Sequence, residues 1–173
     1  MHLAFTGNGK GKTTAAIGNA VRLIGAGKRA LMIQFIKGPW LSGEEKTAKL
    51  LSPDFKIIKM GLGFVGILGD TLPIEKHREA ASEGLRIAKE NIDTGEWDLL
   101  ILDEIHNAIS LSLLSVDTVT LFLDYAKEKV EHVITTGRNA SPEVIWQADL
   151  VTEMKEIKHP YQTGRFAEKG IDF

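Results

Sequence analysis

The stretch Thr6-Gly7-Asn8-Gly9-Lys10-Gly11-Lys12-Thr13-Thr14 decides the fold of this chain. It follows the apolar run from His2 to Phe5 and precedes a helical pattern, which predicts a phosphate-binding loop between a strand and a helix. Glycines let backbone N–H groups surround an anion, and the helix N-terminus adds partial positive charge. In such a loop Lys12 neutralises phosphate and the Thr13 hydroxyl holds Mg²⁺. A glycine-rich turn without a ligand is the alternative, and Gly-Lys-Thr in this context makes it the weaker one.

The loop departs from the usual spacing at one position. The common pattern places a glycine five residues before Gly11, and this chain has Thr6 there. We therefore expect an offset variant of the phosphate-binding loop.

The composition fits one nucleotide-binding domain spanning residues 1–173, long enough to bury about two thirds of its unfolded surface. The 21 Lys+Arg and 23 Asp+Glu residues nearly balance, which argues against nucleic acid or a membrane surface as a partner. The chain has no cysteine, which excludes disulfides and thiolate metal sites. No apolar run approaches the ~20 residues of a membrane span, so we expect a soluble, cytoplasmic protein.

Apolar strands alternate with helical patterns along the chain. We expect a helix from the loop to Gly25, a long helix from Ile74 to Ile92, and further helix starts at Ser115 and Ser141. After the first strand, the expected strands are 29–35, 55–60, 97–102, 130–136 and 150–154. This order predicts a three-layer α/β fold of the P-loop NTPase type with a mostly parallel central sheet. Ligands then bind beyond the carboxyl ends of the strands.

Two acids, Asp103 and Glu104, close the most apolar of the expected strands. Phosphate-loop proteins place the carboxylate that orients Mg²⁺ at this position. Alternate strand residues point to opposite faces, so the choice between the two acids stays open, and we favour Glu104 with Asp103 as support. A second acid also positions the attacking water in hydrolases, so ATP hydrolysis is an alternative. A polar strand-to-helix turn without metal is the structural alternative.

Arg138 lies beside a glycine at the end of another expected strand, in Thr135-Thr136-Gly137-Arg138-Asn139. It either reaches the phosphates or is a surface arginine in a turn. Four histidines show no metal-ligand spacing, and we interpret them as solvated or core-edge residues: His77, His106, His132 and His159.

The segment from Gly61 to Asp70 combines glycines with large apolar residues, which is unusual for an exposed loop. It is either a mobile lip for a large apolar ligand or a buried crossover packed on the sheet.

Taken together, several motifs resemble the ATP:corrinoid adenosyltransferases of the P-loop type, from one end of the chain to the other. They are the 6–14 loop, Gln34-Phe35-Ile36-Lys37-Gly38, Gly63-Phe64, Leu102-Asp103-Glu104, Thr136-Gly137-Arg138 and Lys169-Gly170-Ile171-Asp172-Phe173. The resemblance implies transfer of the 5′-deoxyadenosyl group of ATP to the Co(I) centre of a corrinoid, with release of triphosphate. In that family ATP lies reversed relative to P-loop hydrolases. Co(I) is itself a strong nucleophile and needs no protein base.

The resemblance also implies residue roles. Lys12, Glu104, Arg138 and Phe64 are the expected catalytic residues, with Arg138 on the triphosphate and Phe64 facing the corrin. Thr13 and Glu104, supported by Asp103, are the expected Mg²⁺ (or Mn²⁺) ligands. The expected phosphate-contacting residues are Gly7, Asn8, Gly9, Lys10, Gly11, Lys12, Thr13 and Thr14. The chain departs from the family pattern at Gly66, where a tryptophan is common.

A homodimer and an electron-donor reductase are the protein partners that the resemblance implies. Better-known relatives also carry an N-terminal helix that covers the corrinoid site of the neighbouring subunit, and this chain begins at the first strand. Two other functions stay open from the residues alone. One is an ATP hydrolase or phosphotransferase, and the other is a non-enzymatic module whose partner affinity changes with ATP.

Overall fold

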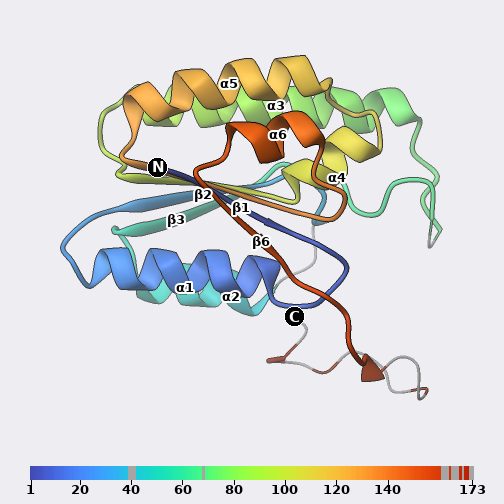
Figure 1. Cartoon of the computed structure of the whole chain (residues 1–173), viewed down its shortest axis with the longest axis horizontal. Coiled ribbons are helices and arrows are strands. Elements are labelled where there is room, and N and C mark those ends of the chain that lie inside the picture. Colours follow the sequence, from blue (N-terminus) through green and yellow to red (C-terminus); the bar gives the residue numbers. More distant parts are fainter. Residues whose placement is uncertain (39–41, 68, 161–163, 165–167, 169, 172–173) are drawn as a thin grey trace.

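The computed structural model describes residues 1–38, 42–67, 69–160, 164, 168 and 170–171. Six strands form one sheet in the order β3-β2-β4-β5-β1-β6, and all five strand pairs are parallel (Figure 1). The strands are β1 (His2–Thr6), β2 (Ala30–Gln34), β3 (Phe55–Lys59), β4 (Leu99–Asp103), β5 (His132–Thr136) and β6 (Leu150–Glu153). The predicted α/β fold with a parallel central sheet is confirmed.

Helices cover both faces of the sheet (Figure 1). The helices α1 (Lys12–Ile24) and α2 (Gly43–Leu50) lie on one face; α3 (Ile74–Ile92), α4 (Ile105–Ser110), α5 (Val116–Lys129) and α6 (Pro142–Gln147) lie on the other. Alternate strand residues serve the two layers: Leu31 packs with the α3 and α5 side, and Met32 packs with α1 and α2. Because both faces are covered, the central strands β2 and β4 are apolar at every residue except the last.

The long α3 helix and the two serine caps agree with the sequence. The hydroxyl oxygens of Ser115 and Ser141 accept hydrogen bonds from the third residue that follows each of them. Two helices have no counterpart among the predicted elements. They are α2, which buries only Ala48, and α4, which is six residues long. Both are too short to show a helical period.

The carboxyl ends of the strands meet at one edge of the sheet, which places the sequence motifs together. The phosphate-loop motif follows β1, the two acids end β4, and Arg138 follows β5. The register pairs Gln34 of β2 directly with Asp103 of β4. Asp103 shares the strand face of Leu99 and Ile101, which pack against the α1 side. The first acid, Asp103, therefore faces the phosphate-loop side of the sheet.

Among the described residues, no helix has the length and apolar character of a membrane span.

Candidate active site

The phosphate loop is docked on the chain that follows β6. The Gly9 N–H donates to the Met154 carbonyl at 2.7 Å, and the Met154 N–H donates to the Thr6 carbonyl at 2.8 Å. A Cβ atom would lie 2.4 Å from the Met154 oxygen at Gly7 and 2.7 Å from it at Gly9. Real Cβ atoms do not approach backbone this closely, so these two positions need glycine to let the loop dock.

Thr6, at the position where the usual motif has glycine, has a structural role. The residue is buried, and its hydroxyl accepts a hydrogen bond from the Ala140 N–H at 3.1 Å. Ala140 lies in the turn between β5 and α6. Thr6 therefore fastens that turn to the start of the phosphate loop.

Lys12 and Thr13 begin α1, with Gly11 at the N-cap in the left-handed region at φ +114°. The Lys12 ammonium donates to the carbonyl oxygens of Gly7 at 2.8 Å and Gly9 at 2.7 Å. Burial lowers the pKa of Lys12, and the nearby charge of Glu104 opposes that shift. The lysine is thus held under the loop by neutral carbonyl groups, which a phosphate can displace.

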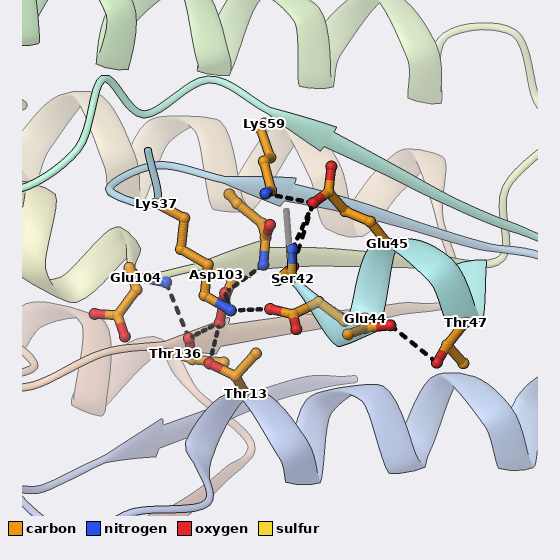
Figure 2. Close-up of polar contacts among 12 residues, drawn as sticks. Thr13, Lys37, Ser42, Glu44, Glu45, Thr47, Lys59, Asp103, Glu104 and Thr136 are labelled. Carbon is orange, nitrogen blue, oxygen red and sulfur yellow. Dashed lines mark hydrogen bonds and ion pairs between the residues drawn. The ribbon is translucent and has the colours of Figure 1, made fainter. Parts of the chain in front are cut away.

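Asp103 is fully buried and organises three side chains around itself (Figure 2). Its Oδ1 accepts from the hydroxyls of Thr13 at 2.8 Å and Thr136 at 2.7 Å, and its Oδ2 accepts from the Gln34 amide at 3.0 Å. Polar atoms of a buried side chain need such hydrogen-bond partners, because burial removes them from water. Because the Thr13 hydroxyl proton is directed at Asp103, the lone pairs of the Thr13 oxygen remain available to a cation.

Glu104 turns out of the strand into the site. It has φ +64° and ψ +20°, a left-handed conformation that is uncommon for residues other than glycine, and its N–H donates to the Thr136 hydroxyl at 2.9 Å. Burial raises the pKa of Glu104, the charge of Asp103 adds to the rise, and Lys12, Lys37 and Arg138 oppose it. A carboxylate that is costly to ionise gains from a cation beside it.

A cavity of about 700 Å³ opens above these residues. All residues from Asn8 to Thr14 line it, together with Glu104 and Arg138. Gly7 and Asp103 support the wall without lining it. Arg138 is an exposed residue of the turn after β5 and also lines the cavity, and its backbone N–H donates to the Asn107 side-chain oxygen at 2.6 Å.

Part of the cavity wall was not identified from the sequence. Helix α2 contributes Gly43, Glu44 and Thr47, and Lys37 lies beside them after β2. His159, which the sequence analysis treated as solvated or core-edge, also lines the cavity, as do Gly170 and Ile171. Gly170 and Ile171 belong to the terminal motif that carries the family resemblance. Residues 169, 172 and 173 of the terminal motif lie outside the described residues.

The segment after β3 is largely exposed, in agreement with the lip alternative and against a fully buried crossover. Leu62, Phe64, Ile67 and Leu72 are 42%, 47%, 59% and 44% exposed, whereas Val65 packs on the core. Phe64 does not line the phosphate cavity. The start of the segment, however, lies next to the cavity wall. Gly61 packs so tightly on the backbone of Ile36 that a Cβ would lie 2.4 Å from the Ile36 carbonyl carbon, and the residue after Ile36 is the cavity-lining Lys37.

The donor chemistry of the site fits Mg²⁺. The oxygen atoms of Thr13 and Glu104 line the cavity and are hard donors of the kind that Mg²⁺ prefers, and Asp103 lies behind Thr13 and accepts a hydrogen bond from its hydroxyl. Within the described ranges no three His, Cys, Asp or Glu side chains gather into a metal site.

Comparisons with known proteins agree with this geometry. A family model described as ATP:corrinoid adenosyltransferase BtuR/CobO/CobP matches residues 1–173. The chain is 34% identical over 171 residues to the corrinoid adenosyltransferase of Escherichia coli (strain K12), covering 99% of this chain and 84% of that protein. It is 37% identical over 169 residues to the corrinoid adenosyltransferase of Sinorhizobium sp, covering 97% and 78%.

Among solved structures, the flagellar accessory protein FlaH from Methanocaldococcus jannaschii is similar, with a TM-score of 0.54 and 15% identity. The match covers 88% of this chain and 69% of FlaH, and at this identity it supports the fold alone. The family model spans the whole chain, and the curated relatives share its name. The chain therefore belongs to the ATP:corrinoid adenosyltransferase family.

Proposed function

We propose that this protein transfers the 5′-deoxyadenosyl group of ATP to the Co(I) centre of a corrinoid and releases triphosphate. One observation carries the proposal: the exposed apolar segment around Phe64 starts at Gly61, which packs on Ile36, the residue before the cavity-lining Lys37. A polyanion and a large, mainly apolar ring system find complementary surfaces there. Family membership identifies ATP and a corrinoid as the two substrates that fit.

The reaction asks for positioning and charge neutralisation. Co(I) attacks the 5′ carbon of ATP, the carbon–oxygen bond breaks, and its electron pair leaves with the triphosphate. The protein needs no general base, because the metal supplies the nucleophile. Lys12 and Arg138, which both line the cavity, would neutralise the leaving triphosphate, and the N–H groups of the 7–14 loop would hold it in place.

Mg²⁺ would be held by Thr13 and Glu104, with Asp103 as the support that orients Thr13. The hydrogen bond from the Thr13 hydroxyl to Asp103 and the cavity position of Glu104 support this division of roles. When bound, the ion adds positive charge at the phosphates and makes the triphosphate a better leaving group. The raised pKa of Glu104 means that a divalent ion relieves an unfavourable charge.

Phe64 would face the corrin and favour loss of the lower cobalt ligand, which makes cobalt easier to reduce. Its 47% exposure in the segment next to the cavity supports contact with a bulky ligand. We further propose a homodimer, an electron-donor reductase as partner, and the cytoplasm as location. The family, the use of ATP and the cysteine-free composition support these three proposals.

The test is an anaerobic reaction of the protein with MgATP and chemically reduced cob(I)alamin, in which the corrinoid spectrum and the phosphorus products are followed together. Adenosylcobalamin with an equal amount of triphosphate is the expected result. Unchanged corrinoid with orthophosphate would support the hydrolase alternative. Binding of ATP without turnover would support the non-enzymatic module.

A further inference from the structure

The cavity contains an ion pair that the proposed mechanism has not used. Lys37 follows β2, Glu44 lies in the first turn of α2, and both line the cavity. The Lys37 ammonium donates a hydrogen bond to the Glu44 carboxylate and lies 4.0 Å from Oδ2 of Asp103 (Figure 2). A carboxylate in the wall of an anion-binding cavity repels phosphate unless a cation offsets it. The placement of this pair therefore needs a functional explanation.

Lys37 and Arg138 occupy matching positions in the sheet. They follow β2 and β5, the two strands that flank β4, so they stand on either side of the two acids. Lys12 lies under the phosphate loop and lines the same cavity. A triphosphate spreads its charge over three phosphoryl groups, and cations on more than one side neutralise it better than Lys12 alone.

The exposure of the two side chains fits a lysine that meets a ligand and an acid that holds it. The Lys37 side chain is 32% exposed and that of Glu44 is 12% exposed. Burial acts to raise the pKa of Glu44, but the hydrogen bond and charge of Lys37 outweigh it, so the pKa is lowered. Glu44 is therefore ionised at neutral pH and keeps the ammonium at the mouth of the cavity.

We propose that Lys37 is a further catalytic residue, whose ammonium contacts the triphosphate of ATP and neutralises it as it leaves, and that Glu44 is a positioning residue for Lys37. The inference rests on the proposed transfer reaction. Lys37 moves no proton. It remains an ammonium while the carbon–oxygen bond breaks and the electron pair goes to the triphosphate oxygen.

A purely structural role for the pair is the competing explanation, and the chain offers a matched control. Lys59 pairs with Glu45 at 2.6 Å, in the same turn of α2. Ser42 completes this turn as the N-cap, and its N–H donates to Glu45 at 2.9 Å. Lys59 does not line the cavity. Lys37→Met and Lys59→Met each remove one ion pair from α2, but only the first removes a cation from the cavity.

The experiment titrates Mg²⁺ and inorganic tripolyphosphate into the full-length variants by calorimetry, and it measures kcat and KM for ATP with cob(I)alamin. Lys37→Met should weaken tripolyphosphate binding and lower kcat by about tenfold or more each, because a charge-assisted contact is lost. Lys59→Met should leave both quantities within about twofold of the unmodified protein, because the partly buried pair that it removes lies outside the cavity. Glu44→Gln should lower kcat with little change in the KM for ATP.

Equal effects of Lys37→Met and Lys59→Met on binding and kcat would overturn the inference, as would an unmodified protein that does not bind tripolyphosphate. If Lys37→Met has a lower melting temperature than the unmodified protein, Lys37→Gln is used in its place, because its side-chain amide retains a hydrogen bond to Glu44. Tripolyphosphate binding does not depend on corrinoid chemistry. A protein that makes no adenosylcobalamin would therefore contradict the proposed function, while the comparison of Lys37 with Lys59 would still decide whether Lys37 contacts phosphate.

Discussion

Two glycine-rich segments follow the strands β1 and β3 at the carboxyl edge of the sheet, and they use glycine in different ways. In the phosphate loop, Gly7 and Gly9 lie against the backbone after β6 with no room for a Cβ. In the segment after β3, Gly66 and Gly69 have positive φ angles, and a Cβ on either would meet no atom within 4 Å. The first loop needs glycine for close approach, and the second needs it for backbone conformation.

The two segments also differ in the side chains that they present. The phosphate loop directs a lysine, a threonine and backbone N–H groups at a cavity whose floor is charged. The segment after β3 exposes apolar side chains, and the carboxylate of Asp70 fastens it by accepting from the N–H groups of Gly66 at 2.7 Å and Leu72 at 3.0 Å. We infer that the enzyme divides its substrates accordingly, with phosphates in the first loop and corrin at the second.

The largest effect is expected for Lys12→Ala. The variant removes the cation that the carbonyls of Gly7 and Gly9 hold under the loop, so adenosyl transfer should fall by about a thousandfold or more. The fold should persist, since the Lys12 ammonium bonds only to loop carbonyls and not to the core. Anaerobic transfer kinetics with a thermal melt as control measure both quantities. Transfer at the unmodified rate would remove Lys12 from the site.

The next largest effect is expected for Gly9→Ala. Its Cβ would lie 2.7 Å from the Met154 oxygen, so the loop must move away from β6 and its phosphate-binding N–H groups must shift. We expect a loss in ATP affinity of about a hundredfold, roughly the 3 kcal/mol of a few weakened phosphate contacts.

Gly69→Ala is the matched control for Gly9→Ala. It has space for a Cβ and meets only the strain of φ +83°, about 1 kcal/mol of stability, without loss of ATP affinity. Equal losses of ATP affinity in the two variants would show that the loops do not differ as described.

Phe64→Ala should produce a smaller and more selective effect. If Phe64 helps cobalt lose its lower ligand, the variant should slow the reaction from Co(II) with a reductant by about tenfold, on the scale of one lost aromatic contact. The reaction from preformed Co(I) should change much less, and the KM for ATP should stay the same. Equal loss from both oxidation states would reduce Phe64 to a packing role.

The smallest effect is expected for Glu104→Gln, and it concerns the stability of the folded protein. The folded-state pKa of Glu104 is raised, chiefly by burial and then by Asp103, so its ionised form destabilises the folded protein. That cost is absent below the ordinary pKa of 4.5 and grows as the pH rises through the folded-state value. Glu104→Gln should therefore raise the melting temperature at neutral pH, with the gain vanishing at acid pH. A variant less stable at neutral pH than the unmodified protein would contradict this assignment.

Much of the fold and half of the cavity could be predicted, because the signals are contiguous in the sequence. The 6–14 loop, the acids after the most apolar strand and Arg138 after β5 each carry a local motif, and parallel topology brings them together. The face of Asp103 could not be predicted. It follows from the pairing of β2 with β4, a long-range property of the sheet.

The part of the cavity wall that α2 forms could not be predicted, for a different physical reason. Helix α2 has eight residues and buries only Ala48, so its sequence carries almost no period. Its first turn is held by a serine cap and by ion pairs to Lys37 and Lys59, which lie outside the helix. The wall is therefore specified by tertiary contacts rather than by a local pattern.

The proposed reaction places the attack of Co(I) on the 5′ carbon of ATP rather than on phosphorus. ATP labelled with ¹⁸O at the oxygen that bridges the 5′ carbon and the α-phosphorus tests it directly, in the anaerobic reaction with cob(I)alamin. All of the label is expected to leave with triphosphate, because the bond between the 5′ carbon and the bridging oxygen breaks. Label that remains on the nucleoside, in ADP or AMP, would mean attack at phosphorus and would contradict the account.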